Sequence, residues 1–309
     1  MRVAVVDIGT NSTRLLIAEV GPAPGGPIEE LVRRSQVTRL GAGVDATGRL
    51  SEEAVQRVRS VLEGYRADIE SHRCERNLAV LTSAVRDASN GARFAALVRD
   101  EYGLDARVLS GEEEAQLTFL GAMASREREE GRTVVIDIGG GSTEFVTGAD
   151  HTVGFHVSLH AGVVRMSERH IRSDPPTPAE LRELAGDARR VYLDGLPLEQ
   201  RRAVTAGVAV AGTATSAASI DQALDPYDPA RVEGYELTLD TVEGLLGRLA
   251  AMTEADRRRV VGLDPGRAPT IVAGMILLEE AMRAFELDRV EVSEHDILHG
   301  GALRLAGRG

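Results

Sequence analysis

One motif that occurs twice constrains this chain more than any other feature. Its fuller copy is the Val-Val-Ile-Asp-Ile run at 134–138, followed by glycines at 139–141 and a second short strand that begins at Glu144. A β-branched run favours a buried strand. Consecutive glycines permit positive φ and close approach of a ligand, and their amides can form an anion-binding concavity. With Asp137 and Glu144 flanking the turn and Ser142 adding a hydroxyl, the stretch predicts a site for phosphate and a metal ion.

The second copy lies near the N-terminus. Both copies contain Asp-Ile-Gly-x-x-Ser-Thr, and Asp7 lies 130 residues before Asp137. This period is too long for a solenoid repeat but fits two duplicated domains. Two lobes that each present a phosphate-binding hairpin predict a ligand held in a cleft between them.

Composition excludes several classes of protein. The formal net charge is −12, and aromatic residues are few, which argues against a nucleic-acid partner. All 36 basic residues are Arg, so the chain has no lysine for a P-loop, a protein-kinase site or a Schiff base. We therefore expect an anionic substrate to be met locally, by glycine-loop amides, a few Arg side chains and a divalent cation such as Mg²⁺ or Mn²⁺.

The sequence carries no sign of a secreted or membrane protein. Cys74 is the single cysteine, which excludes an internal disulfide and favours a reducing compartment. No basic segment followed by an apolar core opens the chain, and no long uncharged apolar run is present. We expect a cytoplasmic protein with no membrane partner.

Helix signals surround a group of acidic residues near the middle of the first half. Ser110 and Glu113 fit a capping box before a helix predicted over 112–126. Glu112, Glu113 and Glu114 lie in its first turn, where acidic residues complement the helix dipole. Glu114 is also one turn from Leu117, so it should face the lobe junction rather than solvent. A functional role for Glu114 and a dipole role have equal weight on spacing alone.

Two further signals are weaker. Gly212 and Thr213 follow a strand predicted over 203–211 and open a helix, which makes them candidate phosphate-binding residues, although small residues there also serve close packing. His295 and His299 are four residues apart on a predicted terminal helix, a spacing that suits a metal pair. No third ligand is evident, and histidines in this pattern are several times more often surface or packing residues.

The motifs together resemble the exopolyphosphatase / guanosine pentaphosphate phosphohydrolase family. The matching segments occur in family order and include Asp-Ile-Gly-Gly-Gly-Ser-Thr-Glu at 137–144; the others lie at 5–12, 82–88, 109–115, 211–213 and 292–298. The resemblance implies an α/β fold with two ribonuclease-H-like lobes of the actin and sugar-kinase superfamily around an active-site cleft. We place the lobes at 1–121 and 122–296, with a terminal helix at about 297–309 that packs back on the first lobe.

The resemblance also implies roles for individual residues. Glu114 would be the general base that activates water, and Arg86, at a strand-to-helix junction, would clamp phosphate. Asp137 and Glu144 would hold the metal or position the water, and Asp7 would help to organise the metal site. Hydroxyls and backbone amides would bind phosphoryl oxygens at Asn11, Ser12, Thr13, Gly139, Gly140, Gly141 and Ser142.

The chain departs from the family pattern in two places. Longer members carry a C-terminal helical domain, whereas this sequence stops at Gly309, which puts tracking along long polyphosphate in doubt. Pro269 stands where the family often has Asp, which blurs the role of Arg267. A homodimer is common in the family, although the sequence shows no interface signal.

Four functions are compatible with these residues. The first is a metal-dependent exopolyphosphatase that removes terminal phosphate from inorganic polyphosphate, with a preference for shorter chains. The second has the same chemistry with guanosine pentaphosphate as substrate. A nucleotide-dependent kinase or ATPase leaves Glu114 without a role, and a non-catalytic polyphosphate sensor conflicts with the complete set of carboxylates.

Overall fold

The computed structural model describes residues 1–21, 28–124, 126, 131–149 and 152–307, and it divides into two compact units. Unit 1 comprises Met1–Glu127 and His295–Gly309, and unit 2 comprises Arg128–Glu294. The boundary expected at 121/122 would fall inside helix α5 (Gly111–Met123), whose side chains belong to the core of unit 1. The final segment joins unit 1 because helix α14 (Ile297–Leu305) packs on α5 and on the first strands.

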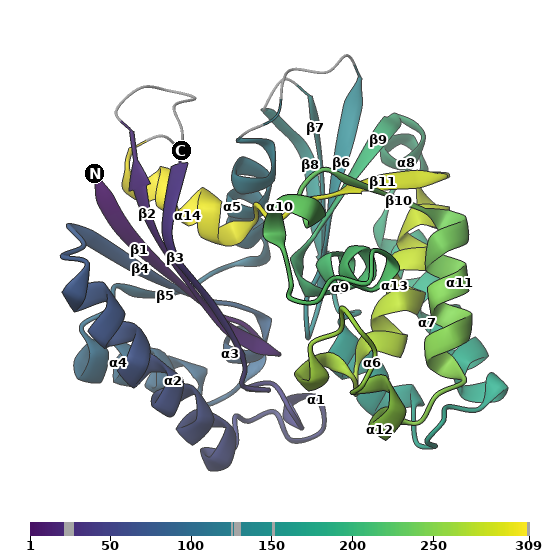
Figure 1. Cartoon of the computed structure of the whole chain (residues 1–309), viewed down its shortest axis with the longest axis horizontal. Coiled ribbons are helices and arrows are strands. Elements are labelled where there is room, and N and C mark those ends of the chain that lie inside the picture. The colour runs from purple at the N-terminus through teal and green to yellow at the C-terminus, as the bar shows by residue number, and fades with distance from the viewer. Residues whose placement is uncertain (22–27, 125, 127–130, 150–151, 308–309) are drawn as a thin grey trace. The chain divides into compact units, whose positions relative to one another are not determined.

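Unit 1 is built on a five-stranded mixed sheet with the order β3-β2-β1-β4-β5 (Figure 1). The first two strand pairs are antiparallel, and β1 pairs in parallel with β4, which pairs in parallel with β5. The strands are β1 (Arg2–Ile8), β2 (Ser12–Val20), β3 (Ile28–Val37), β4 (Arg76–Leu81) and β5 (Ala106–Val108).

Helices cover both faces of this sheet, which explains why β1 is almost wholly apolar. Alternate residues of β1 enter two cores: Ala4, Val6 and Ile8 pack on the side of α2 and α4, and Val3 and Val5 pack on the side of α14. The helices of unit 1 are α1 (Val44–Thr47), α2 (Glu52–Ser71), α3 (Ser83–Asp87), α4 (Gly91–Tyr102), α5 and α14.

Unit 2 repeats the arrangement with one additional strand. Its sheet has the order β10-β11-β9-β6-β7-β8, with the β6-β7-β8 meander antiparallel and β6, β9 and β11 parallel. The strands are β6 (Arg132–Ile138), β7 (Thr143–Ala149), β8 (Thr152–Leu159), β9 (Val204–Val210), β10 (Tyr235–Thr238) and β11 (Arg289–Val292). Without β10, this order matches that of unit 1 strand for strand, so both units have the expected ribonuclease-H-like sheet.

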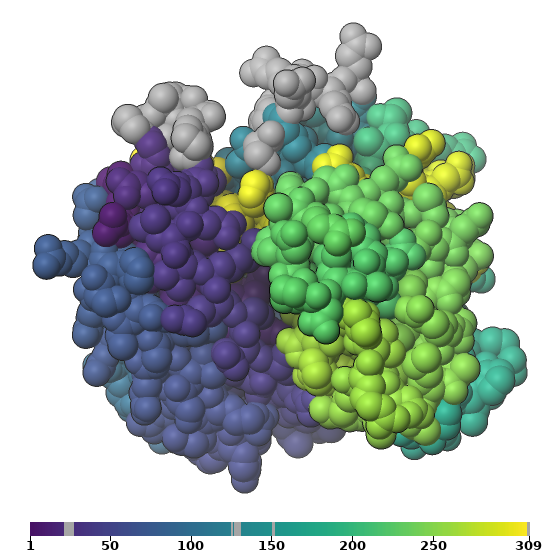
Figure 2. Space-filling view, in the orientation of Figure 1, coloured from purple at the N-terminus to yellow at the C-terminus, as the bar shows by residue number. Residues whose placement is uncertain are grey.

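The helices of unit 2 bury one large core. Helix α13 is the centre of it, with almost every side chain buried against α7, α9 and α11. Figure 2 shows that the segment containing α10 to α12, in green, forms much of the visible surface of this unit. The helices are α6 (Val163–His170), α7 (Pro178–Gly195), α8 (Leu198–Arg202), α9 (Ala211–Asp221), α10 (Pro229–Val232), α11 (Leu239–Ala250), α12 (Glu254–Arg257), the 3₁₀ helix η1 (Pro265–Arg267) and α13 (Ile271–Ala284).

The capping motifs in the sequence predicted the helix starts better than the helix ends. The Ser110–Glu113 capping box is present in full, although α5 ends at Met123, three residues before the expected end. Helix α14 begins at Ile297 with Asp296 as its N-cap, so the expectation that His295 lies on this helix is wrong. Throughout the described part of the chain, no helix is long and apolar enough to cross a membrane.

Two helices of unit 1 approach each other through glycine. A Cβ at Gly300 of α14 would lie 1.9 Å from the carbonyl oxygen of Leu117, and one at Gly121 of α5 would lie 1.9 Å from that of Asp296. The backbones can only meet at this separation because neither position carries a side chain. The docking of α14 therefore depends on both glycines.

We expect Gly300→Ala to lower the free energy of unfolding by about 1–3 kcal/mol, because overpacking outweighs the gain of up to ~1 kcal/mol in helix propensity. Gly64→Ala in α2 is the matched control, since its Cβ would meet nothing within 4 Å. Urea unfolding followed by circular dichroism measures both variants. Equal stability of Gly300→Ala and Gly64→Ala would show that α14 can move away at no cost.

Candidate functional site

The two copies of the motif fold into matching hairpin turns. The Gly9 amide donates to the Ser12 carbonyl at 3.0 Å, and the Gly139 amide donates to the Ser142 carbonyl at 2.9 Å. The predicted strand, turn and returning strand are therefore present in both units. The register places Asp7 opposite Arg14 and Asp137 opposite Glu144.

The glycines of the second turn work differently from the expectation. In the described part of the chain, positive φ occurs at seven glycines, and Gly139, Gly140 and Gly141 are not among them. A further glycine, Gly162, instead lets the chain return close to this turn: a Cβ at Gly162 would lie 2.4 Å from the Gly140 carbonyl carbon. The first amides of α6 then donate to the carbonyls of Gly139 and Gly140. Hydrogen bonds from the N-terminus of α6 thus stabilise the turn.

The hairpin of unit 1 carries an ion-pair network. Arg14 donates from Nε and Nη2 to Asp7 Oδ2, at 2.9 and 2.6 Å, and from Nη1 to Asp296 Oδ2. Burial raises the pKa of Asp7, and the charge of Arg14 only partly opposes this. Burial acts in the same direction on Asp296, but Arg14 and Arg33 outweigh it and hold the pKa of Asp296 below its usual value. Arg14 therefore holds two carboxyl groups at the base of the turn.

The hairpin of unit 2 pairs two acidic residues, Asp137 and Glu144, at the positions where unit 1 pairs Asp7 with the basic Arg14. Asp137 and Glu144 are 7% and 1% exposed. Directly paired strand residues project from the same face with Cβ atoms about 5 Å apart, so the two carboxylates are neighbours. Ser158 donates from Oγ to Glu144 Oε1 at 2.7 Å and orients that side chain. Two adjacent buried carboxylates favour a cation between them.

These residues fit the divalent cation that the resemblance implies. Mg²⁺ prefers carboxylate and water oxygens, and Asp137 with Glu144 supplies such oxygens on one face. In unit 1, Asp7 Oδ1 is also buried, with no hydrogen-bond partner in the described part of the chain. Because Asp7 Oδ2 accepts from Arg14, Oδ1 is the atom of this carboxyl group that remains open to a further hydrogen bond.

The polar residues of the first turn separate into two groups. Asn11 Oδ1 is buried without a partner among the residues described, and Ser12 is 9% exposed, so both suit an added ligand. The Thr13 hydroxyl instead bonds the Thr38 hydroxyl at 2.9 Å, and the Thr13 carbonyl accepts from Tyr65. The Thr13 side chain thus serves the core, although a role for its amide stays a prediction.

Two residues expected to act in catalysis contact each other. Arg86, in α3, donates from Nη1 to Glu114 Oε2 at 2.9 Å and to the Leu109 carbonyl at 3.0 Å. Glu114, in the first turn of α5, is 7% exposed, as expected from its spacing, whereas Glu112 and Glu113 are exposed. A helix-dipole role does not require burial, so the burial and the ion pair distinguish Glu114 from its neighbours.

The Gly212 turn lies where β9 meets α9. Ala211 has φ of 63°, an uncommon left-handed conformation for a residue with a side chain. A Cβ at Gly212 would lie 1.5 Å from Arg267 Nη1, so the guanidinium of Arg267 rests directly on this glycine. Thr213 is 5% exposed. An Arg at a helix N-terminus is suited to phosphate, which makes Arg267 a candidate despite Pro269.

Two residues at the base of the first turn were not expected from the sequence: Arg14, which pairs with Asp7, and Asp296, which pairs with Arg14. One signal could have found Arg14, because it occupies the position after Ser-Thr that Glu144 occupies in the second copy. The role of Asp296, 282 residues away from Arg14, has no local signal.

Known proteins resemble this chain over its full length. The model of the Ppx/GppA phosphatase family matches residues 16–308. Exopolyphosphatase 2 of Mycobacterium tuberculosis is 41% identical, with 99% of each chain covered. Exopolyphosphatase 1 of the same species is 31% identical, covering 98% of this chain and 88% of its own.

Solved structures agree with the sequence relatives. The Aquifex aeolicus member of the Ppx/GppA family has a TM-score of 0.82 at 31% identity, with 100% of this chain and 99% of that chain covered. An exopolyphosphatase from Cytophaga hutchinsonii has a TM-score of 0.89 at 26% identity, with 99% and 98% covered. The duplicated hairpins, the buried acids and these likenesses lead to one conclusion: the chain belongs to the Ppx/GppA phosphatase family.

Proposed function

We propose that this protein is an exopolyphosphatase that hydrolyses the terminal phosphate of inorganic polyphosphate. The observation that carries the proposal is the buried Glu114 carboxylate, which Arg86 holds in the first turn of α5. The curated relatives named exopolyphosphatase support the choice of substrate. No observation on the described residues favours guanosine pentaphosphate, which serves as the comparison substrate.

In this proposal Glu114 accepts a proton from the attacking water. Phosphoryl transfer depends mainly on positioning and on neutralising charge, and a carboxylate base contributes about 10²–10⁴-fold. Arg86 holds Glu114 in place and supplies positive charge to the phosphate. Each hairpin turn, and the Gly212 turn, offers amides and hydroxyls that can bind phosphoryl oxygens.

We assign Asp137 and Glu144 to a divalent ion, with Mg²⁺ first and Mn²⁺ second. When bound, such an ion neutralises phosphate charge and orients water. Ser158 keeps Glu144 in position, and in unit 1 Asp7 offers its open Oδ1 as a hydrogen-bond acceptor. With a net charge of −12, the chain needs this local compensation to bind a polyanion.

The test of the proposal is the release of orthophosphate, with Mg²⁺ present, from short polyphosphate, long polyphosphate and guanosine pentaphosphate. We expect release from polyphosphate, faster on short chains. Preference for guanosine pentaphosphate would replace the substrate, and no release from any of the three would reject the hydrolase proposal for this chain.

We expect Asp137→Asn to raise the Mg²⁺ concentration for half-maximal activity at least about tenfold, because one anionic ligand is lost. Asp100→Asn is the control, since Asp100 is an exposed acid of α4. Calorimetric titration with Mg²⁺ gives the same comparison without substrate. Unchanged Mg²⁺ affinity in Asp137→Asn would remove this residue from the metal site.

Two finer expectations belong to the same proposal. The family resemblance implies a homodimer, and the single cysteine favours the cytoplasm. Light scattering after gel filtration would give twice 33.0 kDa for a dimer.

A further inference from the structure

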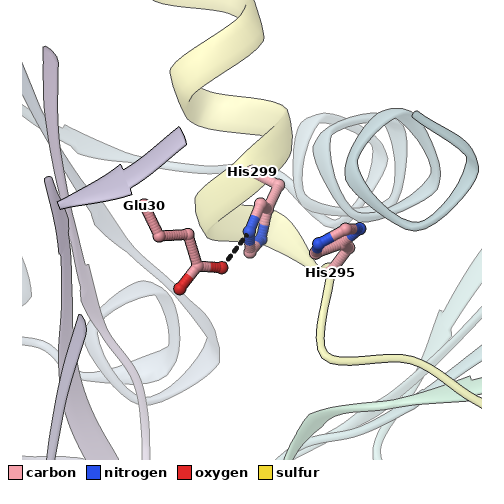
Figure 3. A group of neighbouring side chains, drawn as sticks. All are labelled: Glu30, His295 and His299. Atoms are coloured by element: carbon pink, nitrogen blue, oxygen red, sulfur yellow. Dashed lines mark hydrogen bonds and ion pairs between the residues drawn. The ribbon is translucent and has the colours of Figure 1, made fainter. Parts of the chain in front are cut away.

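Three metal-ligating side chains meet beside the start of α14, in unit 1. Glu30, His295 and His299 each offer one ligand atom, and these atoms all lie within 4.8 Å of one another. Figure 3 shows the Glu30 carboxylate pointing at the ring of His299, with the ring of His295 alongside. The Nε2 atom of His299 is 2.8 Å from Glu30 Oε1, and the two imidazole centroids are 4.2 Å apart.

Unrelated parts of the chain supply these groups. Glu30 lies on the edge strand β3, His299 in the first turn of α14, and His295 just before that helix. The expected i, i+4 pair on one helix is thus replaced by a loop residue and a helix residue. The third ligand is Glu30, which lies 269 residues before His299 in the chain and was not evident from the sequence pattern.

A β-bulge in the β2–β3 pair turns the Glu30 side chain towards α14. The register of β2 and β3 shifts between Ile17, opposite Val32, and Ala18, opposite Glu30, so Leu31 is an extra residue. Side chains two apart on a regular strand share a face, but here Val32 packs in the core beside α2, whereas Ala18, opposite Glu30, packs beside α14. Bulges are a recognised way to redirect a side chain at a functional site.

The ligand types suit a transition metal better than Mg²⁺. Two imidazoles and one carboxylate, with the fourth position open to water, form a common Zn²⁺ set. Zn–N and Zn–O distances near 2.0–2.2 Å place tetrahedral ligand atoms about 3.3 Å apart. To bind Zn²⁺, the 2.8 Å distance between His299 Nε2 and Glu30 Oε1 must lengthen slightly. The ligand atoms that lie farther apart, up to 4.8 Å, must move closer to one another.

The exposure of the ligands also suits a bound ion. The His299 side chain is 1% exposed, whereas that of Glu30 is 31% exposed, so one side of the site is open to solvent. Figure 2 shows the purple segment that includes β3 at the visible surface of unit 1.

We propose that Glu30, His295 and His299 form a Zn²⁺ site that fastens the terminal segment to β3. His299 then binds Zn²⁺ through Nε2 as a neutral imidazole, so the proton shared with Glu30 moves to Nδ1 and the 3.4 Å contact from the Asp296 amide is given up. The site uses none of the residues assigned to hydrolysis. Asp296 lies between the two histidines in sequence and binds Arg14, so an ion there would also fix the segment that supports Asp7.

A purely structural interpretation competes with this proposal. The Asp296 amide donates to His299 Nδ1 at 3.4 Å in the capping box of α14, and a neutral His299 can then donate from Nε2 to Glu30. That arrangement needs His299 and Glu30 but does not need a ligand atom from His295. His295 is therefore the residue that separates the two interpretations.

The experiment measures Zn²⁺ binding without an activity assay. The full chain is stripped with a chelator and dialysed against Zn²⁺ in excess Mg²⁺, which occupies carboxylate sites that prefer a hard cation. Metal content by mass spectrometry gives the stoichiometry, competition with a chromogenic chelator gives the affinity, and Co²⁺ substitution reports tetrahedral coordination by its visible absorption.

Wild type is compared with His295→Gln and Glu30→Gln, and with His72→Gln as a control histidine of the same unit. His299 is left intact because it caps α14. We expect about one Zn²⁺ per chain, an affinity at least about tenfold lower in both ligand variants, and no change in His72→Gln. Zn²⁺ should raise the melting temperature of wild type and of the control variant only.

Equal Zn²⁺ affinity in wild type and His295→Gln, with both folded by circular dichroism, would overturn the proposal and leave the hydrogen-bonded interpretation. Absence of a Co²⁺ band characteristic of tetrahedral geometry in wild type would do the same. Because neither readout involves phosphate release, failure of the hydrolase proposal leaves this result unaffected.

Discussion

Glu114→Gln should reduce kcat for phosphate release by about 10²–10⁴-fold, the range expected when a general base is removed. Gln has nearly the same shape, and its oxygen can still accept from Arg86, which also retains the Leu109 carbonyl. The substitution therefore removes the proton acceptor with little change in packing. Rates of orthophosphate release from polyphosphate, at saturating substrate, measure the effect.

Glu112→Gln is the matched control for this variant. Glu112 lies in the same first turn of α5 but is exposed. If the acidic residues only complement the helix dipole, the two substitutions should have similar, small effects of a few tenths of a kcal/mol on stability. A wild-type rate for Glu114→Gln would contradict the role of general base, and an equally large loss in Glu112→Gln would point to damage to the helix.

Arg14→Met should lower the free energy of unfolding of unit 1 by about 3–5 kcal/mol, the cost of leaving buried charges without their partner. Arg14 bridges Asp7 and Asp296, whose side chains are 7% and 2% exposed. Denaturant unfolding at neutral pH measures the loss. Arg14→Lys keeps a positive charge but not the forked geometry, so it should recover part of the stability.

The effect of Arg14→Met should depend on pH. The pKa of Asp296 is held low in the folded protein, so its stabilising contribution is present above the usual Asp value of 3.8 and disappears as pH falls through the folded value. Removing Arg14 abolishes that contribution, so the difference between wild type and variant should shrink below pH 3.8. A difference that stays constant on acidification would show that Arg14 stabilises unit 1 through packing alone.

The secondary structure around the site was predicted from short-range sequence signals. The Asp-Ile-Gly hairpins and the Ser110 capping box depend on residues within a few positions of one another, and the structure contains them. Burial of Glu114 followed from its spacing to Leu117. Short elements such as α1, with four residues, lack a periodic pattern long enough to detect.

Contacts between distant residues account for what the sequence did not reveal. The Arg14–Asp296 pair spans 282 residues, and the Glu30–His299 pair spans 269. Nothing in the local chain around either partner specifies the other, because the contact arises only when α14 docks on the sheet of unit 1. The bulge that aims Glu30 is likewise a property of the β2–β3 register.

The sequence by itself determined the family, the duplicated fold and the acidic residues of the candidate site, because hydrophobic periodicity, turn chemistry and motif spacing are local. Only the tertiary structure decided how those residues are partnered. It placed Arg86 on Glu114, Arg267 on Gly212, and Arg14 between two carboxyl groups. Burial and charge compensation depend on which surfaces pack together, and that is settled by the whole chain at once.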